Sequence, residues 1–174
     1  MSFPRCTGQV PIYYNYPGAM STGCRYYYSE DVIAYNDNLS TPMYPFGYGL
    51  SYTEFKYYNI YCSEDKIAYK DILDGKKFKL FVTVKNIGKY AGKETVQCYI
   101  HDKVASMTRP LKELKGISKE YFEPDEEKEI CFELGLNELA FYNTNAEFKP
   151  EPGEFEIYIG RDCYAEKCMS VYII

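Results

Sequence analysis

Stretches in which apolar and polar residues alternate recur from residue 51 onward, and they limit the folds that this chain can adopt. The clearest is residues 77–85, where Phe78 and every second residue after it are apolar. Successive side chains of a β-strand point to opposite faces, so this period of two predicts strands with one buried face. Turn residues such as Asn86–Gly88 and Pro124–Glu126 separate the stretches. The pattern therefore predicts an all-β domain.

About seven short strands are expected in this part of the chain. They cover residues 55–61, 77–85, 94–100, 111–122, 130–134, 155–159 and 168–174. Gly116 interrupts the fourth strand, and residues 136–141 are expected to form one helical turn with Asn137 as its cap. Short strands joined by turns in this number are typical of a β-sandwich of the immunoglobulin or fibronectin III type. A β-barrel is the main alternative.

Residues 1–50 show little periodicity and are rich in turn residues and tyrosines. Residues 10–14 suggest one short strand, which Pro11 would place at a sheet edge or a strand end. A segment of this kind cannot bury a core by itself. We therefore divide the chain into residues 1–50, an irregular N-terminal linker or a piece of a neighbouring domain, and residues 51–174, the sandwich domain.

Charge and hydropathy argue against two classes of partner. The net charge is −5, and Lys and Arg form no run. Nucleic acid and anionic membranes are therefore not expected as partners. No apolar run approaches the roughly 20 residues that span a bilayer. Residues 1–5 are not followed by the apolar stretch of a signal peptide.

The cysteines indicate free thiols. There are seven, an odd number, and the chain has a single histidine, His101. A structural zinc site needs clustered Cys and His residues, so no metal is expected. Cys62, Cys98 and Cys131 lie within apolar strand patterns and are predicted to be small buried hydrophobes. Reduced thiols suit a cytoplasmic protein, which is the localisation we expect.

Five stretches, in order along nearly the whole chain, resemble the C-terminal region of family 3 glycoside hydrolases of the β-glucosidase type. They are residues 3–15, 42–55, 83–92, 104–116 and 151–155. The first resembles the end of that family's α/β sandwich domain, and the second resembles the start of its fibronectin III-like domain. Pro124-Asp125-Glu126 departs from the Pro-Gly-Glu that is usual in the family.

The resemblance implies a part of a retaining, exo-acting enzyme that releases terminal sugars, most often glucose. The family's nucleophile is an Asp in an N-terminal barrel, and its acid/base is usually a Glu in the second domain. Both lie upstream of anything that matches here, so no position of this chain inherits either role. The resemblance therefore implies no catalytic residue, no cofactor site and no metal site in this chain, which alone is expected to be inactive.

The remaining candidates for catalysis have simpler interpretations. Glycoside hydrolysis needs two carboxylates about 5 to 9.5 Å apart, but acidic residues such as 125–127, Glu154 and Glu156 are expected on solvated faces. His101 beside Asp102 is interpreted as a loop histidine at a strand end, because the sequence places no nucleophile near it. Gly47–Gly49 lacks the third glycine of a dinucleotide site and is interpreted as turn glycines.

Aromatic residues of the linker have two interpretations. They either line a carbohydrate site or pack against the parent's catalytic domains. We favour packing, because Tyr combines apolar area with a polar tip. The residues are Tyr26–Tyr28, Tyr44, Phe46, Tyr48 and Tyr52. Arg109 is interpreted as a similar docking residue or a surface arginine. Asn38-Leu39-Ser40 is a glycosylation sequon that has meaning only in a secreted parent.

Three functions remain open from the sequence. The first is a non-catalytic accessory domain that packs on and stabilises the catalytic domains of the same parent chain. The second is a carbohydrate-binding module that holds oligosaccharide, which needs a row of aromatics on the sandwich itself. The third is a plain interaction domain. The identity of the sugar is not encoded in these residues.

Overall fold

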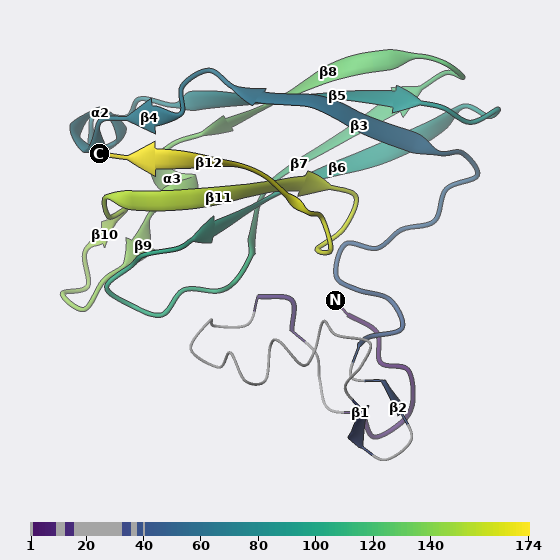
Figure 1. The fold of residues 1–174 in the computed structure, drawn as a ribbon, viewed down its shortest axis with the longest axis horizontal. Helices are drawn as coiled ribbons and strands as arrows, with labels where there is room; N and C mark the ends of the chain where they lie inside the picture. The colour runs from purple at the N-terminus through teal and green to yellow at the C-terminus, as the bar shows by residue number, and fades with distance from the viewer. Residues whose placement is uncertain (1, 10–12, 16–32, 36–37, 40) are drawn as a thin grey trace.

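The computed structural model describes residues 2–9, 13–15, 33–35, 38–39 and 41–174 (Figure 1). Several predictions from the sequence therefore fall outside the described residues. They are residues 10–12 of the strand expected over 10–14, the Tyr26–Tyr28 run, Cys24, and Ser40 of the sequon. Within the described part, no helix is long and apolar enough to cross a membrane.

Two sheets face each other and form a β-sandwich (Figure 1). The larger sheet has the strand order β4 (Lys66–Ile67), β12 (Lys167–Ile173), β11 (Gly153–Gly160), β6 (Gly92–Asp102) and β7 (Glu113–Phe122). Its β4–β12 pair alone is parallel. The smaller sheet has the order β3 (Phe55–Cys62), β5 (Phe78–Asn86) and β8 (Glu127–Leu134). The predicted sandwich is confirmed, and the barrel alternative is wrong.

Shorter elements complete the described structure. Two hairpins pair β1 (Ile33–Tyr35) with β2 (Asn38–Leu39) and β9 (Phe141–Tyr142) with β10 (Phe148–Lys149). Two short helices, α2 (Tyr69–Leu73) and α3 (Leu136–Leu139), lie between strands. The seven long strands correspond to the seven predicted ones, whereas β4, α2 and the β9–β10 hairpin were not predicted.

The core lies between the two sheets and is built by the alternating residues of the sequence. Leu80, Val82 and Val84 of β5 are fully buried, and so are Val96 and Cys98 of β6. The remaining buried core side chains come mainly from β8, β11 and β12, namely Ile130, Phe132, Leu134, Phe155, Ile157, Ile159, Val171 and Ile173. Each such aliphatic side chain contributes roughly 1.5–3 kcal/mol by leaving water.

Glycine at position 116 is required by the packing of β7. A Cβ atom there would lie 2.7 Å from Cδ1 of Phe132 in the facing sheet and 3.3 Å from Cβ of Cys98. The β6–β7 register shifts between Cys98 and Tyr99, next to this position. The predicted interruption at Gly116 is therefore a bulge that brings the two sheets close together.

One turn and one helix start differ from what the sequence led us to expect. Asp125 has φ 62°, in the left-handed region where glycine is favoured and Asp is tolerated, which explains why this turn accepts Asp in place of the family's usual Gly. The predicted cap at Asn137 is wrong. The N-cap of α3 is Gly135, whose N–H donates to Oε2 of Glu138 at 2.8 Å.

The cysteines only partly follow the prediction. Cys98 is buried in the core, Cys62 is half-buried, and Cys131 is exposed. Cys131 lies between Ile130 and Phe132, which both point inward, so the alternation places its side chain on the outer face. The prediction that Cys131 is buried was wrong for that reason. Cys62, Cys98, Cys131, Cys163 and Cys168 are free thiols.

Candidate functional site

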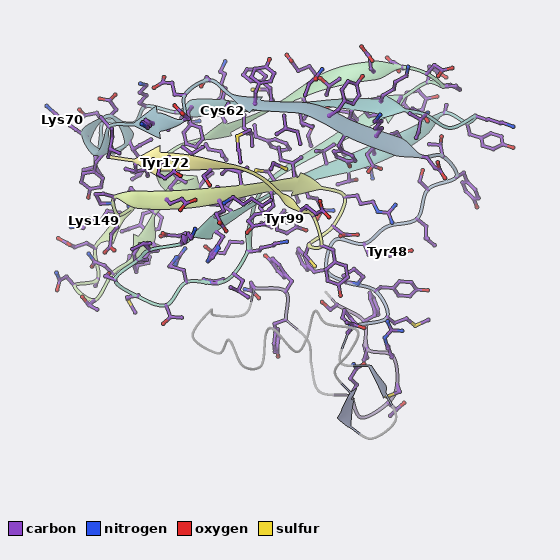
Figure 2. The ribbon with its side chains drawn as sticks, viewed as in Figure 1. Tyr48, Cys62, Lys70, Tyr99, Lys149 and Tyr172 are labelled. Atoms are coloured by element: carbon purple, nitrogen blue, oxygen red, sulfur yellow. The ribbon has the colours of Figure 1, made fainter. Side chains whose placement is uncertain are left out.

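Residues 41–54, the end of the linker and the start of the sandwich domain, pass the outer face of the five-stranded sheet and then the end of the sandwich before they reach β3 (Figure 1). We call this segment the strap. Gln97 Nε2 donates to the carbonyls of Gly47 at 2.9 Å and Arg161 at 2.5 Å. The hydroxyl of Tyr99 donates to Gln97 Oε1 at 2.6 Å (Figure 2). Gln97 and Tyr99 point outward by alternation but are buried, because the strap covers them.

Gly47 is the residue that allows the strap to approach the sheet. It has φ 82°, and a Cβ atom would lie 2.2 Å from Gln97 Oε1 and 2.8 Å from the hydroxyl oxygen of Tyr99. The interpretation of Gly47 as a turn glycine is confirmed by this conformation. A second anchor follows from its neighbour, since Cys163 N donates to the carbonyl of Phe46 at 3.0 Å.

Aromatic stacking extends this attachment to the start of the chain. The rings of Tyr14 and Phe46 stack with centroids 3.9 Å apart, and Tyr14 also meets Tyr99 edge-on at 5.9 Å. Leu114 N donates to the hydroxyl of Tyr14 at 3.3 Å. Phe46 therefore packs against its own domain, rather than being reserved for a partner as the sequence suggested.

Other aromatic side chains of the linker face solvent. Phe3 and Tyr44 pair through their backbones and meet edge-on at 6.4 Å, and Tyr44 stacks on Tyr48 at 5.1 Å. Together with Met43 these residues form an exposed apolar surface, which we call the strap patch: Phe3, Met43, Tyr44 and Tyr48. These side chains are ordered against one another, yet each remains between 36% and 54% exposed.

A second exposed apolar surface lies where the strap leads into β3. Leu50 is 87% exposed and Tyr52 is 97% exposed. Ile87 and Tyr90 are also exposed, in the β5–β6 turn at the same end of the sandwich (Figure 1). The strap and this turn are joined, because Ile87 N donates to the carbonyl of Glu54 at 2.8 Å. We call Leu50, Tyr52, Ile87 and Tyr90 the end patch.

Asn86 holds the end patch in place from below. Its side chain is fully buried and accepts hydrogen bonds from Thr53 Oγ1 at 2.6 Å and Gly88 N at 3.1 Å. Its amide nitrogen donates to the carbonyl of Tyr90 at 2.8 Å. One buried side chain therefore ties the strap to the β5–β6 turn, which fixes the backbone beneath the exposed residues.

A hollow of about 610 Å³ separates the middle of the strap from the sheet. Glu94, which is buried, lies on its wall and accepts a 2.6 Å hydrogen bond from the hydroxyl of Tyr57. Burial raises the pKa of Glu94 above its ordinary value, and burial next to Glu94 raises the pKa of Tyr57 as well. Arg161 and Lys93 also line this hollow, so its wall carries both signs of charge.

Arg109 is largely covered within the sandwich rather than lying on its surface. Its side chain is 16% exposed, lies over the ring of Phe141 at 4.6 Å, and donates to Oε2 of Glu113 at 2.5 Å. Its Nε lies 4.0 Å from Oδ2 of Asp102. Both carboxylate oxygens of Asp102 are buried without a hydrogen-bond partner among the described residues. Burial raises the pKa of Asp102 to about 6, although Arg109 opposes the shift.

His101 lies within β6 rather than in a loop, so the loop interpretation was wrong. Its Nδ1 contacts Oε2 of Glu156 at 3.2 Å across the β6–β11 pair. Asp102, the next residue, belongs to the opposite face, as alternation in a strand requires. The carboxylate that His101 contacts is therefore Glu156 of the neighbouring strand, not its sequence neighbour Asp102.

Glu154 and Glu156 lie on the outer face of β11, as expected, but neighbouring side chains cover them in large part. Their side chains are 22% and 13% exposed, beneath ion pairs with Lys103 and Lys167. Burial alone would raise the pKa of Glu156, but hydrogen bonds from Lys167 at 2.7 Å, Tyr158 at 2.8 Å and His101 together hold it at about 2. In contrast, the acidic turn at 125–127 is mostly exposed, as predicted.

A hollow of about 410 Å³ opens beside Glu156 on the outer face of the five-stranded sheet. Lys112 lies on its wall, where Nζ donates to the carbonyls of Cys163 at 3.0 Å and Ala165 at 2.7 Å and sits 4.3 Å above the ring of Tyr158. Burial lowers the pKa of Lys112. The other lining residues are Tyr14, His101, Leu111 and Tyr164. No group of three or more potential metal ligands occurs among the described residues.

Comparisons with known proteins agree with this architecture. A family model described as a fibronectin type III-like domain matches residues 94–163. The thermostable β-glucosidase B of Acetivibrio thermocellus is 41% identical over 170 residues, which cover 92% of this chain and 21% of that protein. The periplasmic β-glucosidase of Salmonella typhimurium is 39% identical over 93% of this chain and 20% of its own length. A crystal structure of a Listeria innocua β-glucosidase with glucose superposes with a TM-score of 0.81 and 36% identity, covering 99% of this chain and 23% of that one.

The chain belongs to the fibronectin type III-like region of the family 3 glycoside hydrolases. It spans about a fifth of the length of the curated relatives that it matches. The likeness extends beyond the family model, because the Listeria structure covers nearly the whole chain, strap included. The relatives are thus larger proteins in which this fibronectin type III-like region is one part.

Proposed function

We propose that this fibronectin type III-like region is a non-catalytic accessory part of a β-glycosidase, and that it stabilises the catalytic domains by packing on them. The parent would hydrolyse terminal β-D-glucosyl or related residues, as the names of the relatives suggest, which include β-glucosidases and a β-xylosidase. The observation that carries the proposal is the end patch, where Leu50 and Tyr52 are 87% and 97% exposed on a backbone held by Asn86.

Two physical arguments support docking at this end of the sandwich. Large apolar side chains that gather on one surface and are rimmed by polar residues mark interaction sites. Burying Leu50 alone against a partner would contribute roughly 1.5–3 kcal/mol. The strap patch and the end patch both lie on the strap or next to it. The rest of the parent chain is the partner that this geometry fits, since the relatives are about five times longer than this region.

A chimera tests the docking proposal. This chain replaces the matching 170 residues of the Acetivibrio thermocellus relative, and β-glucosidase activity and its half-life at elevated temperature are measured. The double variant Leu50→Ser/Tyr52→Ser should shorten the half-life severalfold. The control is Leu73→Ser/Tyr142→Ser, which changes the same residue types at positions that are 43% and 67% exposed, away from the strap. Equal half-lives for the two double variants would refute docking through the end patch.

A direct assay tests the non-catalytic proposal. The 174-residue chain is incubated with a panel of chromogenic α- and β-glycosides, with a full-length family 3 enzyme as the positive control. Turnover at the background rate supports an accessory role. Turnover that survives repurification would overturn it and would direct attention to the half-buried carboxylates Glu154 and Glu156.

Oligosaccharide is the second candidate partner. The hollow beside Glu156 favours it, because tyrosines and charged groups of the sandwich itself meet there. This arrangement supplies what a carbohydrate-binding module needs, namely aromatic side chains on the sheet rather than on the linker.

A further inference from the structure

The hollow beside Glu156 is built mainly from side chains of the sandwich. Glu156 and Tyr158 come from β11, His101 comes from β6, and Lys112 and Tyr164 come from the loops that follow β6 and β11. Tyr164 is 42% exposed, whereas Glu156 and His101 are largely covered, with side chains 13% and 19% exposed. The hollow therefore has an aromatic rim and a polar wall.

Its polar groups are held in fixed orientations. The Glu156 carboxylate accepts from Lys167 and Tyr158 and contacts His101, and a carboxylate has about four acceptor sites. Lys112 uses two of its three N–H groups on the carbonyls of Cys163 and Ala165 among the described residues. The wall thus offers a ligand an acceptor, the Glu156 carboxylate, and a donor, the Lys112 ammonium. Both side chains are already held in place before a ligand binds, which reduces the entropic cost of binding.

The mixed charge selects the class of ligand. Lys112 on the wall and Lys167, which pairs with Glu156 from outside the lining, repel a cation, and Glu156 repels an anion, so a charged ligand gains little net attraction here. A neutral polyhydroxylated ring suits the site, because hydroxyl groups both donate and accept and the C–H face of a sugar packs on aromatic rings. A volume of about 410 Å³ lies within the range of small-molecule sites.

The outer face continues the same chemistry along β11. Glu154 accepts from Ser170 Oγ at 2.6 Å and from Lys103 Nζ at 3.1 Å. Tyr172 of β12 lies opposite Glu154 in the β11–β12 register and is 40% exposed (Figure 2). Polar groups next to an exposed tyrosine therefore recur one step along the strand from the hollow, where a second ring of a chain would lie.

We propose that the hollow binds one pyranose ring of a neutral β-linked gluco-oligosaccharide, and that the outer face of β11 near Glu154 and Tyr172 contacts the adjoining ring. The choice of glucose rests on the proposed function, whereas the preference for a neutral sugar rests on the lining alone. The site would hold part of the substrate on the accessory domain.

The other sheet provides the matched control. Tyr61 is 46% exposed on the outer face of the three-stranded sheet, much like Tyr164. Its ring stacks on Phe81 with centroids 4.9 Å apart and an interplanar angle of 17°. The two rings turn faces toward each other, so this pair offers a sugar no comparable hollow.

The experiment titrates the 174-residue chain with cellobiose and cellotetraose, followed by NMR shifts and calorimetry. Binding with a Kd of about 1 mM, corresponding to about −4.1 kcal/mol, is expected. Tyr164→Ala and Glu156→Gln should each weaken binding about tenfold, and Tyr61→Ala should leave it unchanged. Tyr172→Ala should weaken cellotetraose binding but not cellobiose binding. Near-ultraviolet circular dichroism confirms that each variant is folded, and Tyr164→Leu replaces Tyr164→Ala if the latter unfolds.

The outcomes separate this proposal from docking. Absence of saturable binding at tens of millimolar sugar would overturn it, as would equal weakening by Tyr61→Ala. Tighter binding of a sulfated glycan than of cellotetraose would assign the site to anions and would also overturn it. Leu50→Ser/Tyr52→Ser, which should shorten the thermal half-life of the chimera, lies outside the hollow and should leave sugar binding by the 174-residue chain unchanged, so failure of sugar binding and failure of docking are distinguishable.

Discussion

Replacing Asn86 with alanine should destabilise the domain more than almost any other polar substitution. The side chain makes three hydrogen bonds, with Thr53 Oγ1, Gly88 N and the carbonyl of Tyr90. Each contributes about 1 kcal/mol net, and a buried partner left unsatisfied costs about 1–3 kcal/mol. Thr53 is itself 9% exposed and would lose its acceptor. Asn86→Ala is therefore expected to lower the free energy of unfolding by about 3–4 kcal/mol.

Asn143 is a matched control for burial. It also makes three side-chain hydrogen bonds, accepting from Asn145 N at 2.9 Å and Glu147 N at 3.1 Å and donating to Glu147 Oε2 at 3.0 Å. These bonds are exposed, so water replaces them and Asn143→Ala should cost about 1 kcal/mol or less. Urea unfolding followed by tyrosine fluorescence and circular dichroism gives both values from the midpoint and slope. Equal losses in the two variants would refute the argument that burial makes Asn86 critical.

Two further predictions concern pH and the strap. The folded-state pKa of Asp102 is about 6 against an ordinary 3.8, so the folded state holds this proton more tightly. Stability should therefore fall by up to about 3 kcal/mol as pH rises from about 4 to about 6, and Asp102→Asn should remove this slope in urea midpoints measured across pH; a slope that survives in the variant would assign it to another group. Gly47→Val should loosen the strap and speed limited proteolysis within residues 41–54, because its Cβ has no room, whereas Gly49→Val, whose Cβ meets nothing within 4 Å, should not. Equal cleavage of the two glycine variants would contradict the role given to Gly47.

Most of the fold could be predicted because alternation is a local signal. In β5 the burial of Phe78, Leu80, Val82 and Val84 follows directly from the period of two in the sequence. The same signal fails for short elements such as β4, because two residues cannot show a period. It also misassigned Cys131, where hydrophobic character was given more weight than the position of the residue in the alternation.

The candidate site was mostly missed because its contacts are distant in sequence. Glu156 and His101 are 55 residues apart and meet only through the β6–β11 register. Nothing near Glu156 in the sequence indicates that ion pairs from neighbouring strands cover it. A signal did exist for Gln97 and Tyr99, which are large polar or aromatic residues on the outward positions of a strand with a buried cysteine between them. Such residues suggest that a further segment covers the sheet.

The covering of β6 bears on where the domain begins. The division at residue 50 stays a prediction, yet strong contacts cross it. Gln97 Nε2 donates a hydrogen bond to the carbonyl of Gly47, and Cys163 N donates one to the carbonyl of Phe46. A sandwich cut at residue 50 would expose Tyr99 and leave these groups to water. The strap therefore belongs energetically to the sandwich although its sequence looks like a linker. Because one side of the strap is fixed to the sheet, the apolar residues on its other side are presented on a rigid support, which is the arrangement a docking surface requires.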